Sequence, residues 1–140
     1  MAKKTWEEKF NNGKQPQIKT IEKAFWGMDA GSRMLIPTPK LIQDYIYHCE
    51  KGNFSEVQTM RDDLAIEAGA DFTCPMTSGI FLRIVCEYHY EKWQLNAEAT
   101  DICPFWRMID PKSDLAKKLS FGSEFITEMR QIETLEKKLL

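Results

Sequence analysis

Hydrophobic residues recur at the spacing of an α-helix in four stretches of the chain, and each stretch predicts a helix. The first helix should begin after Thr38, which suits an N-cap, with Pro39 at its first position, where a missing N–H costs nothing. The second should begin at Ser55, which forms a capping-box pattern with Gln58, and should end at Gly69.

The third and fourth helices lie in the second half of the chain. The third should follow the loop 71–75, with Thr77 or Ser78 as its cap, and run to about Trp93. The fourth should start at about Ser123, and its apolar face contains Phe125, Met129, Ile132, Leu135 and Leu139. The second and third helices, joined by a loop that contains Gly69, are compatible with a helix-turn-helix.

Two other segments have a pattern of their own. Residues 103–109 are rich in strand formers and precede the turn signal 110–113, so they predict a short hairpin or wing, in which Phe105 and Trp106 should face opposite sides. Residues 1–33 combine six lysines with four aromatic rings and predict an N-terminal arm ahead of a domain over residues 34–140. The rings (Trp6, Phe10, Phe25 and Trp26) either clamp the arm onto the domain or grip a partner.

Composition narrows the class of protein. The 140 residues are 43% hydrophobic and 29% charged, which is typical of one globular domain. The apolar runs are too short to span a bilayer and the first residues lack the apolar region of a signal peptide, so we expect a soluble, cytoplasmic protein with no membrane partner. The four cysteines have wide, irregular spacing, which favours reduced thiols over a metal site, and we expect no cofactor. The net charge of −2 argues against strong nucleic-acid binding but permits a local basic face.

Three motifs carry a resemblance to a known family. They are Lys51-Gly52-Asn53-Phe54-Ser55, Cys74-Pro75-Met76-Thr77-Ser78-Gly79-Ile80-Phe81 and Pro104-Phe105-Trp106-Arg107-Met108. With these motifs, residues from Met34 to about Leu135 resemble the C-terminal domain of the methylguanine–DNA methyltransferase family, and more closely a small bacterial branch of it. The resemblance implies a mainly α domain with a small β-hairpin, of the winged-helix type.

Residue by residue, the resemblance implies a loss of the family's chemistry. Pro104 and Arg107 match the family motif, whereas Phe105 stands where active members carry the methyl-accepting cysteine and Trp106 where they carry the activating histidine. Met76 stands at the position of the arginine that fills the gap left by a flipped base. Because alkyl transfer needs a thiolate and a neighbouring base, we expect no transfer at Phe105.

Several candidate site residues remain open to two interpretations. Cys103 is either a displaced nucleophile or a buried thiol. The pocket residues Met76, Pro104, Phe105 and Trp106 either receive a flipped base or fill the core, and we predict a pocket closed by Phe105. The candidate nucleic-acid contacts are phosphate-binding groups at the third helix and the wing, namely Thr77, Ser78, Arg83, Arg107, Lys112, Lys117 and Lys118. For these, the alternatives are helix capping, ion pairing with a carboxylate and plain solvation.

Three functions follow from these interpretations. The first is a non-catalytic, alkyltransferase-like protein that binds double-stranded DNA, with sensing of alkylated or modified bases in DNA repair as its extension. The second is a protein-interaction module that kept the fold and lost DNA binding, favoured by the acidic outer face of the second helix. The third is a methyltransferase that uses Cys103.

Overall fold

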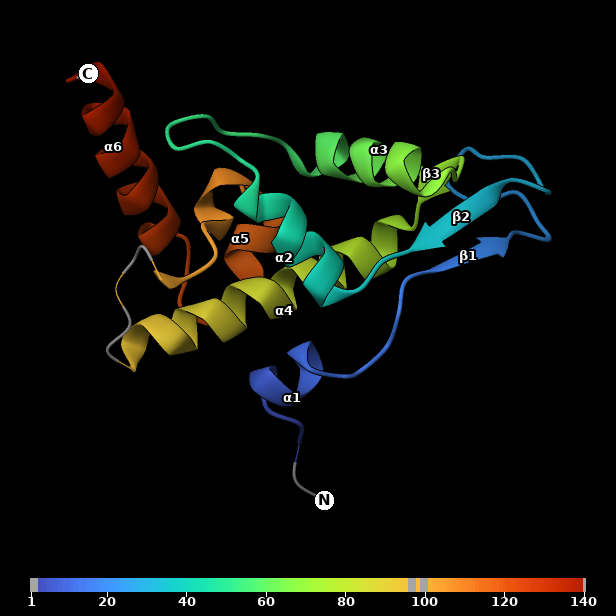
Figure 1. Cartoon of the computed structure of the whole chain (residues 1–140), viewed down its shortest axis with the longest axis horizontal. Coiled ribbons are helices and arrows are strands. Elements are labelled where there is room, and N and C mark those ends of the chain that lie inside the picture. Colours follow the sequence, from blue (N-terminus) through green and yellow to red (C-terminus); the bar gives the residue numbers. More distant parts are fainter. Residues whose placement is uncertain (1–2, 96–97, 99–100, 140) are drawn as a thin grey trace.

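Helices stand where the hydrophobic pattern predicted them. The computed structural model describes residues 3–95, 98 and 101–139. It contains α2 (Pro39–Tyr47), α3 (Val57–Ala68), α4 (Pro75–Gln94) and α6 (Glu124–Lys138), with the short α1 (Trp6–Phe10) and α5 (Asp114–Lys118) in addition. In Figure 1, α4 runs through the middle of the molecule and α6 stands at one end. The prediction of a mainly α fold is confirmed.

Local signals explain the two helix ends that were predicted correctly. Thr38 Oγ1 accepts a hydrogen bond of 3.1 Å from the backbone N–H of Leu41, and Pro39 occupies the first turn of α2. Gly69 ends α3 in the left-handed conformation at a φ of 70°, which glycine adopts without a Cβ clash.

Two predicted caps are wrong. The N-cap of α3 is Glu56, which makes no side-chain capping bond. Ser55 lies outside the helix, because its backbone N–H donates to the carbonyl of Arg107 at 2.7 Å and holds it in the preceding segment. Helix α4 begins at Pro75, before Thr77 and Ser78, because proline already has the φ that a first helical turn needs. Ser78 Oγ then donates back to the carbonyl of Pro75 at 3.1 Å.

The β-structure lies elsewhere than predicted. Strands β1 (Gln17–Thr20) and β2 (Arg33–Ile36) pair antiparallel, and β3 (Phe72–Thr73) adds to β2 in parallel. The hairpin predicted at residues 103–109 is wrong: this segment forms a 3₁₀ turn, η2 (Phe105–Arg107). Its backbone N–H groups bond locally, that of Phe105 to the carbonyl of Cys103 and that of Met108 to the carbonyl of Phe105, so it needs no partner strand.

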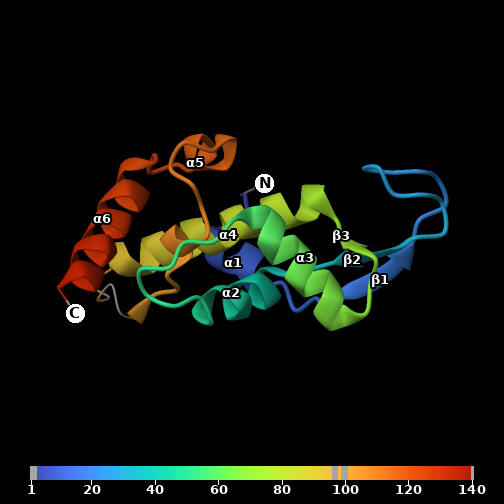
Figure 2. The same ribbon diagram turned by 90° about the horizontal axis from the view of Figure 1, so that it is seen from above.

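Residues 3–33 belong to the folded body. Helix α1 lies against α4, and β1 is an edge strand of the sheet (Figures 1 and 2). Phe10 stacks on Tyr88 of α4 at 4.5 Å between ring centroids, and Phe25 packs against the small cluster of Ile21, Met34 and Cys74. The proposed boundary between residues 33 and 34 falls inside β2.

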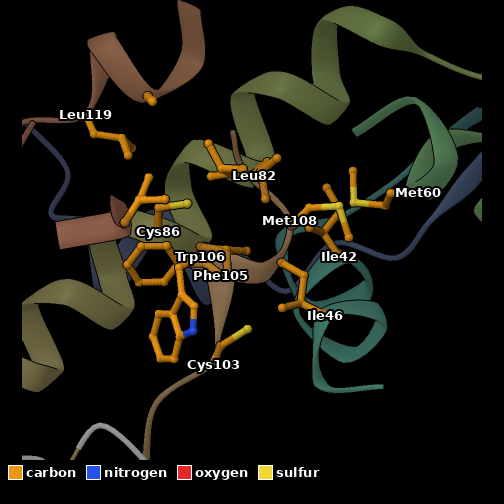
Figure 3. Packing of buried hydrophobic residues seen from close by; sticks show 14 of the residues in the cluster. Ile42, Ile46, Met60, Leu82, Cys86, Cys103, Phe105, Trp106, Met108 and Leu119 are labelled. Atoms are coloured by element: carbon orange, nitrogen blue, oxygen red, sulfur yellow. The ribbon is translucent and has the colours of Figure 1, made fainter. Parts of the chain in front are cut away.

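One large cluster forms the core. Figure 3 shows Phe105 and Trp106 of η2 among Leu82 and Cys86 of α4 and Ile42 and Ile46 of α2. The strand-forming residues around 105 are therefore core residues that α2, α4 and α6 surround. Among the described residues, none of the helices combines the length and apolar character needed to cross a bilayer.

Candidate functional site

The candidate pocket position at Phe105 is closed. Phe105 is 0% exposed, and its ring lies 5.7 Å from that of Phe125 and 5.9 Å from that of Phe121. Phe105 is therefore a core residue, which is what the predicted closure of the pocket by its ring requires. The prediction that Phe105 and Trp106 face opposite sides is wrong, because η2 is not a strand and brings their ring centroids to 5.6 Å within one cluster.

A buried carboxylate organises the residues that follow Phe105. Glu133 of α6 accepts hydrogen bonds from Trp106 Nε1 at 2.6 Å, Arg107 Nε at 3.0 Å and the backbone N–H of Gly52 at 2.8 Å. Burial alone would raise the pKa of Glu133, but these hydrogen bonds and the Arg107 charge outweigh it and hold the pKa below its ordinary value. Glu133 is therefore an ionised, fully paired structural group rather than a free acid or base.

Arg107 is committed to this network. Besides its bonds to Glu133, its Nη1 donates to the carbonyl of Cys49 at 2.8 Å. Its guanidinium therefore has protein partners on two sides and is largely buried, with 14% of the side chain exposed. Of the two interpretations of Arg107, a phosphate contact and an ion pair with a carboxylate, the structure contains the ion pair.

An open groove lies beside Trp106, and Arg107 and Glu133 of the network also line it. Its volume is about 430 Å³. Its apolar walls come from α2, the 102–106 segment and α6, and consist of Tyr47, Ile102, Pro104, Trp106, Met129 and Ile132. Phe105 does not line this groove. The groove is therefore a surface feature separate from the closed position of Phe105.

The fold places a histidine beside Cys103, although the two are far apart in sequence. The backbone N–H of Cys103 donates to His89 Nδ1 at 3.1 Å, and His89 Nε2 lies 2.5 Å from Gln43 Oε1. The thiol itself points to the carbonyl of Gln43, with 3.8 Å between Sγ and oxygen. Cys103 is 0% exposed, and burial raises the pKa of its thiol well above the ordinary value. The imidazole is thus engaged with the backbone, and the geometry is that of a buried thiol.

The first half of α4 presents an apolar outer surface. Met76 is 62% and Ile80 is 56% exposed. Ser78 is fully buried, and Thr77 Oγ1 is buried without a hydrogen-bond partner in the described part of the chain. Neither hydroxyl is therefore in a position to contact a phosphate.

Arg83 continues this outer surface of α4 and meets α1. Its guanidinium carbon lies 5.4 Å above the ring of Trp6, and its Nε is 3.5 Å from Glu87. Glu87 in turn accepts hydrogen bonds from the backbone and hydroxyl of Ser120, which follows α5. Two short helices therefore flank α4, α1 on the Trp6 side and α5 on the Ser120 side.

Solvated lysines stand on both flanks. Lys117 and Lys118 end α5 and are exposed, as is Lys112 in the turn before it. On the other flank, Lys4 lies in the exposed segment before α1, and Lys9 extends over the Trp6 ring at 4.3 Å. The lysines around α5 were predicted from the sequence as site residues, whereas Lys4 and Lys9 were not. The capping-box pattern of Thr5 and Glu8, which the structure realises, was the signal that predicts α1.

Comparisons of this chain with protein-family models, with curated proteins and with solved structures find no match. The resemblance to methylguanine–DNA methyltransferases therefore rests on the sequence motifs alone.

Proposed function

We propose that this chain is a non-catalytic, alkyltransferase-like protein that binds double-stranded DNA on the outer surface of α4. The observation that carries the proposal is the exposed outer side of the first half of α4, formed by Met76 and Ile80. This helix follows α3 through a short connection and has lysine-bearing helices on both flanks. In a helix-turn-helix the second helix enters the major groove, and lysines beside it neutralise phosphates. The exposed outer side of α4 supports this binding mode.

The proposed binding mode uses no flipped base. A flipped base needs an open pocket, and Phe105 is packed on all sides. The contacts are limited to residues that solvent reaches, which removes Thr77, Ser78 and Arg107 from the candidate contacts and retains Lys112, Lys117 and Lys118. Discrimination of alkylated guanine would then depend on groove contacts from α4.

A salt titration with fluorescent duplexes tests this proposal. Anisotropy is measured with a plain duplex and with one that carries methylated guanine. The double variant Lys117→Glu, Lys118→Glu should bind more weakly, and its plot of log affinity against log salt should be flatter by roughly one unit for each phosphate that the protein no longer neutralises. The matched control is Lys19→Glu, Lys23→Glu, two exposed lysines at the sheet end of the molecule, which should leave both quantities unchanged.

Two outcomes would contradict the proposal. The first is an absence of salt-dependent binding to either duplex, and the second is an equal effect of the two double variants. Equal affinity for both duplexes would support DNA binding and contradict the sensing of alkylated bases.

A second function is favoured by the apolar character of α4. Met76 and Ile80 offer no hydrogen bonds to phosphates or base edges, and the outer side of the neighbouring α3 is acidic, with Asp62 and Glu67 exposed. Such a surface suits a protein partner better than a polyanion. Substitution of Ile80 by serine separates the two, since it should weaken a protein contact strongly and salt-dependent DNA binding only slightly.

A further inference from the structure

The last helix carries a row of apolar side chains that no element in residues 3–95, 98 and 101–139 covers. Ile132, Leu135 and Leu139 are 47%, 61% and 86% exposed, whereas Phe125 and Ile126 at the start of the helix are buried. The spacing of three and four residues places Ile132, Leu135 and Leu139 along one side of α6. The helix stands at one end of the molecule in both views (Figures 1 and 2), so this side is accessible to another molecule.

The apolar row continues into the groove beside Trp106. Ile132 is both a member of the row and part of the groove wall, and Tyr47, which is 49% exposed, forms the wall on α2. The surface therefore places the apolar row of Ile132, Leu135 and Leu139 next to a groove of about 430 Å³. A partner with a similar ridge would find a complementary shape here.

The distribution of charge along α6 indicates which kind of partner fits this surface. The first half of the helix has exposed Glu124 and Glu128, and the end has exposed Lys137 and Lys138. Two such helices side by side in the same direction place like charges together. In opposite directions, each acidic half meets a basic end, as in antiparallel helix pairs with complementary charges.

We propose that the α6 helices of two copies of this chain pair antiparallel about a twofold axis. In this pairing Ile132 packs against the partner's Leu135, and the same register brings Glu128 close to the partner's Lys138. The twofold axis repeats both contacts, so each residue is used twice. The groove beside Trp106 receives apolar side chains from the end of the other helix.

The proposed contact is modest in size. Stable interfaces bury about 800 Å² on each partner, and we expect a contact made by one helix side and one groove to bury less than that. The dimer should therefore form reversibly, with a dissociation constant on the order of micromolar. No DNA takes part in this contact, so its test is independent of the proposed function.

Analytical ultracentrifugation of the full chain measures the pairing. From about 1 to about 100 µM, the weight-average mass should rise from 16.3 kDa towards twice that value. Leu135→Glu should weaken the dimer at least about tenfold, because it places a charge in the apolar contact. The matched control is Ile66→Glu on α3, which alters an apolar residue that is more exposed than Leu135 (76% against 61%) and should leave the association unchanged.

Charge exchange tests the antiparallel register. Glu128→Lys and Lys138→Glu should each weaken the dimer by about threefold or more, because each creates two like-charged pairs. The double variant Glu128→Lys, Lys138→Glu should restore the affinity. A mass that stays at 16.3 kDa over the whole range would overturn the proposal, as would an equal weakening in Ile66→Glu or a double variant without recovery.

Discussion

Acidification should destabilise this protein through His89, a residue of α4 that is buried in the protein interior with 1% exposure. Its Nδ1 accepts the backbone N–H of Cys103 and its Nε2 donates to Gln43, so the neutral ring satisfies both neighbours. A second proton on Nδ1 would face the N–H of Cys103 and break that bond. Burial, with a smaller contribution from Lys92, lowers the pKa of His89 from 6.5 to about 4.

The sign of the effect follows from proton uptake. In the unfolded chain His89 takes up its proton at about pH 6.5, whereas in the folded chain it stays neutral until about pH 4. Between these values the unfolded state binds more protons, so stability falls as the pH falls. From about pH 7.5 to about pH 4.5 this one group should reduce the free energy of unfolding by about 2.5 kcal/mol.

Urea unfolding followed by circular dichroism at a series of pH values measures this decline. In the variant His89→Gln, the dependence on pH between about 6.5 and 4.5 should largely disappear, whatever its stability at neutral pH. His48→Gln is the matched control, because the only other histidine is exposed on the end of α2, and this variant should keep the dependence of the parent chain. Below about pH 4.5 the protonation of Glu133 reduces stability further, since its pKa is also held down in the folded state.

A flat profile in the parent chain over this range would refute the reasoning. It would mean that His89 is protonated in the folded state or that solvent reaches it. An identical decline in the parent chain and His89→Gln would assign the acid sensitivity to other groups.

Three further predictions concern the closed site. Phe105→Ala should reduce the free energy of unfolding by about 3–5 kcal/mol in urea unfolding, because it empties a fully packed position, and a reduction under about 1 kcal/mol would contradict that packing. Arg107→Met should also cost about 3–5 kcal/mol by leaving the Glu133 charge buried and unpaired, and adding Glu133→Leu should recover part of that stability, while no recovery would argue against a direct pair. Cys103 should neither gain a methyl group from methylated duplex in mass spectrometry nor react with a thiol reagent until the chain unfolds, and rapid labelling of the native protein at Cys103 would revive the displaced-nucleophile hypothesis.

Sequence by itself determined the helices whose signals are local. Thr38 and Pro39 start α2 and Gly69 ends α3 through interactions within a few residues, and apolar periodicity marks the body of each helix. These features depend on backbone geometry and nearby hydrogen bonds, so no knowledge of the rest of the fold is needed. The expectation that Phe105 stands where the methyltransferase family carries its cysteine also comes from the motif alone, and it stays a prediction.

Tertiary structure decided the features that depend on contacts between distant residues. Strand β1 exists because it pairs with β2, and the aromatic residues of η2 are core residues because α4 and α6 enclose them; composition alone made that segment resemble a strand. Glu133 is ionised in the interior because Trp106, Arg107 and Gly52 converge on it from other parts of the chain. Only folding reveals that three of the five residues predicted for the apolar face of α6 (Ile132, Leu135 and Leu139) remain exposed, since periodicity shows which side of a helix is apolar but not what packs against it.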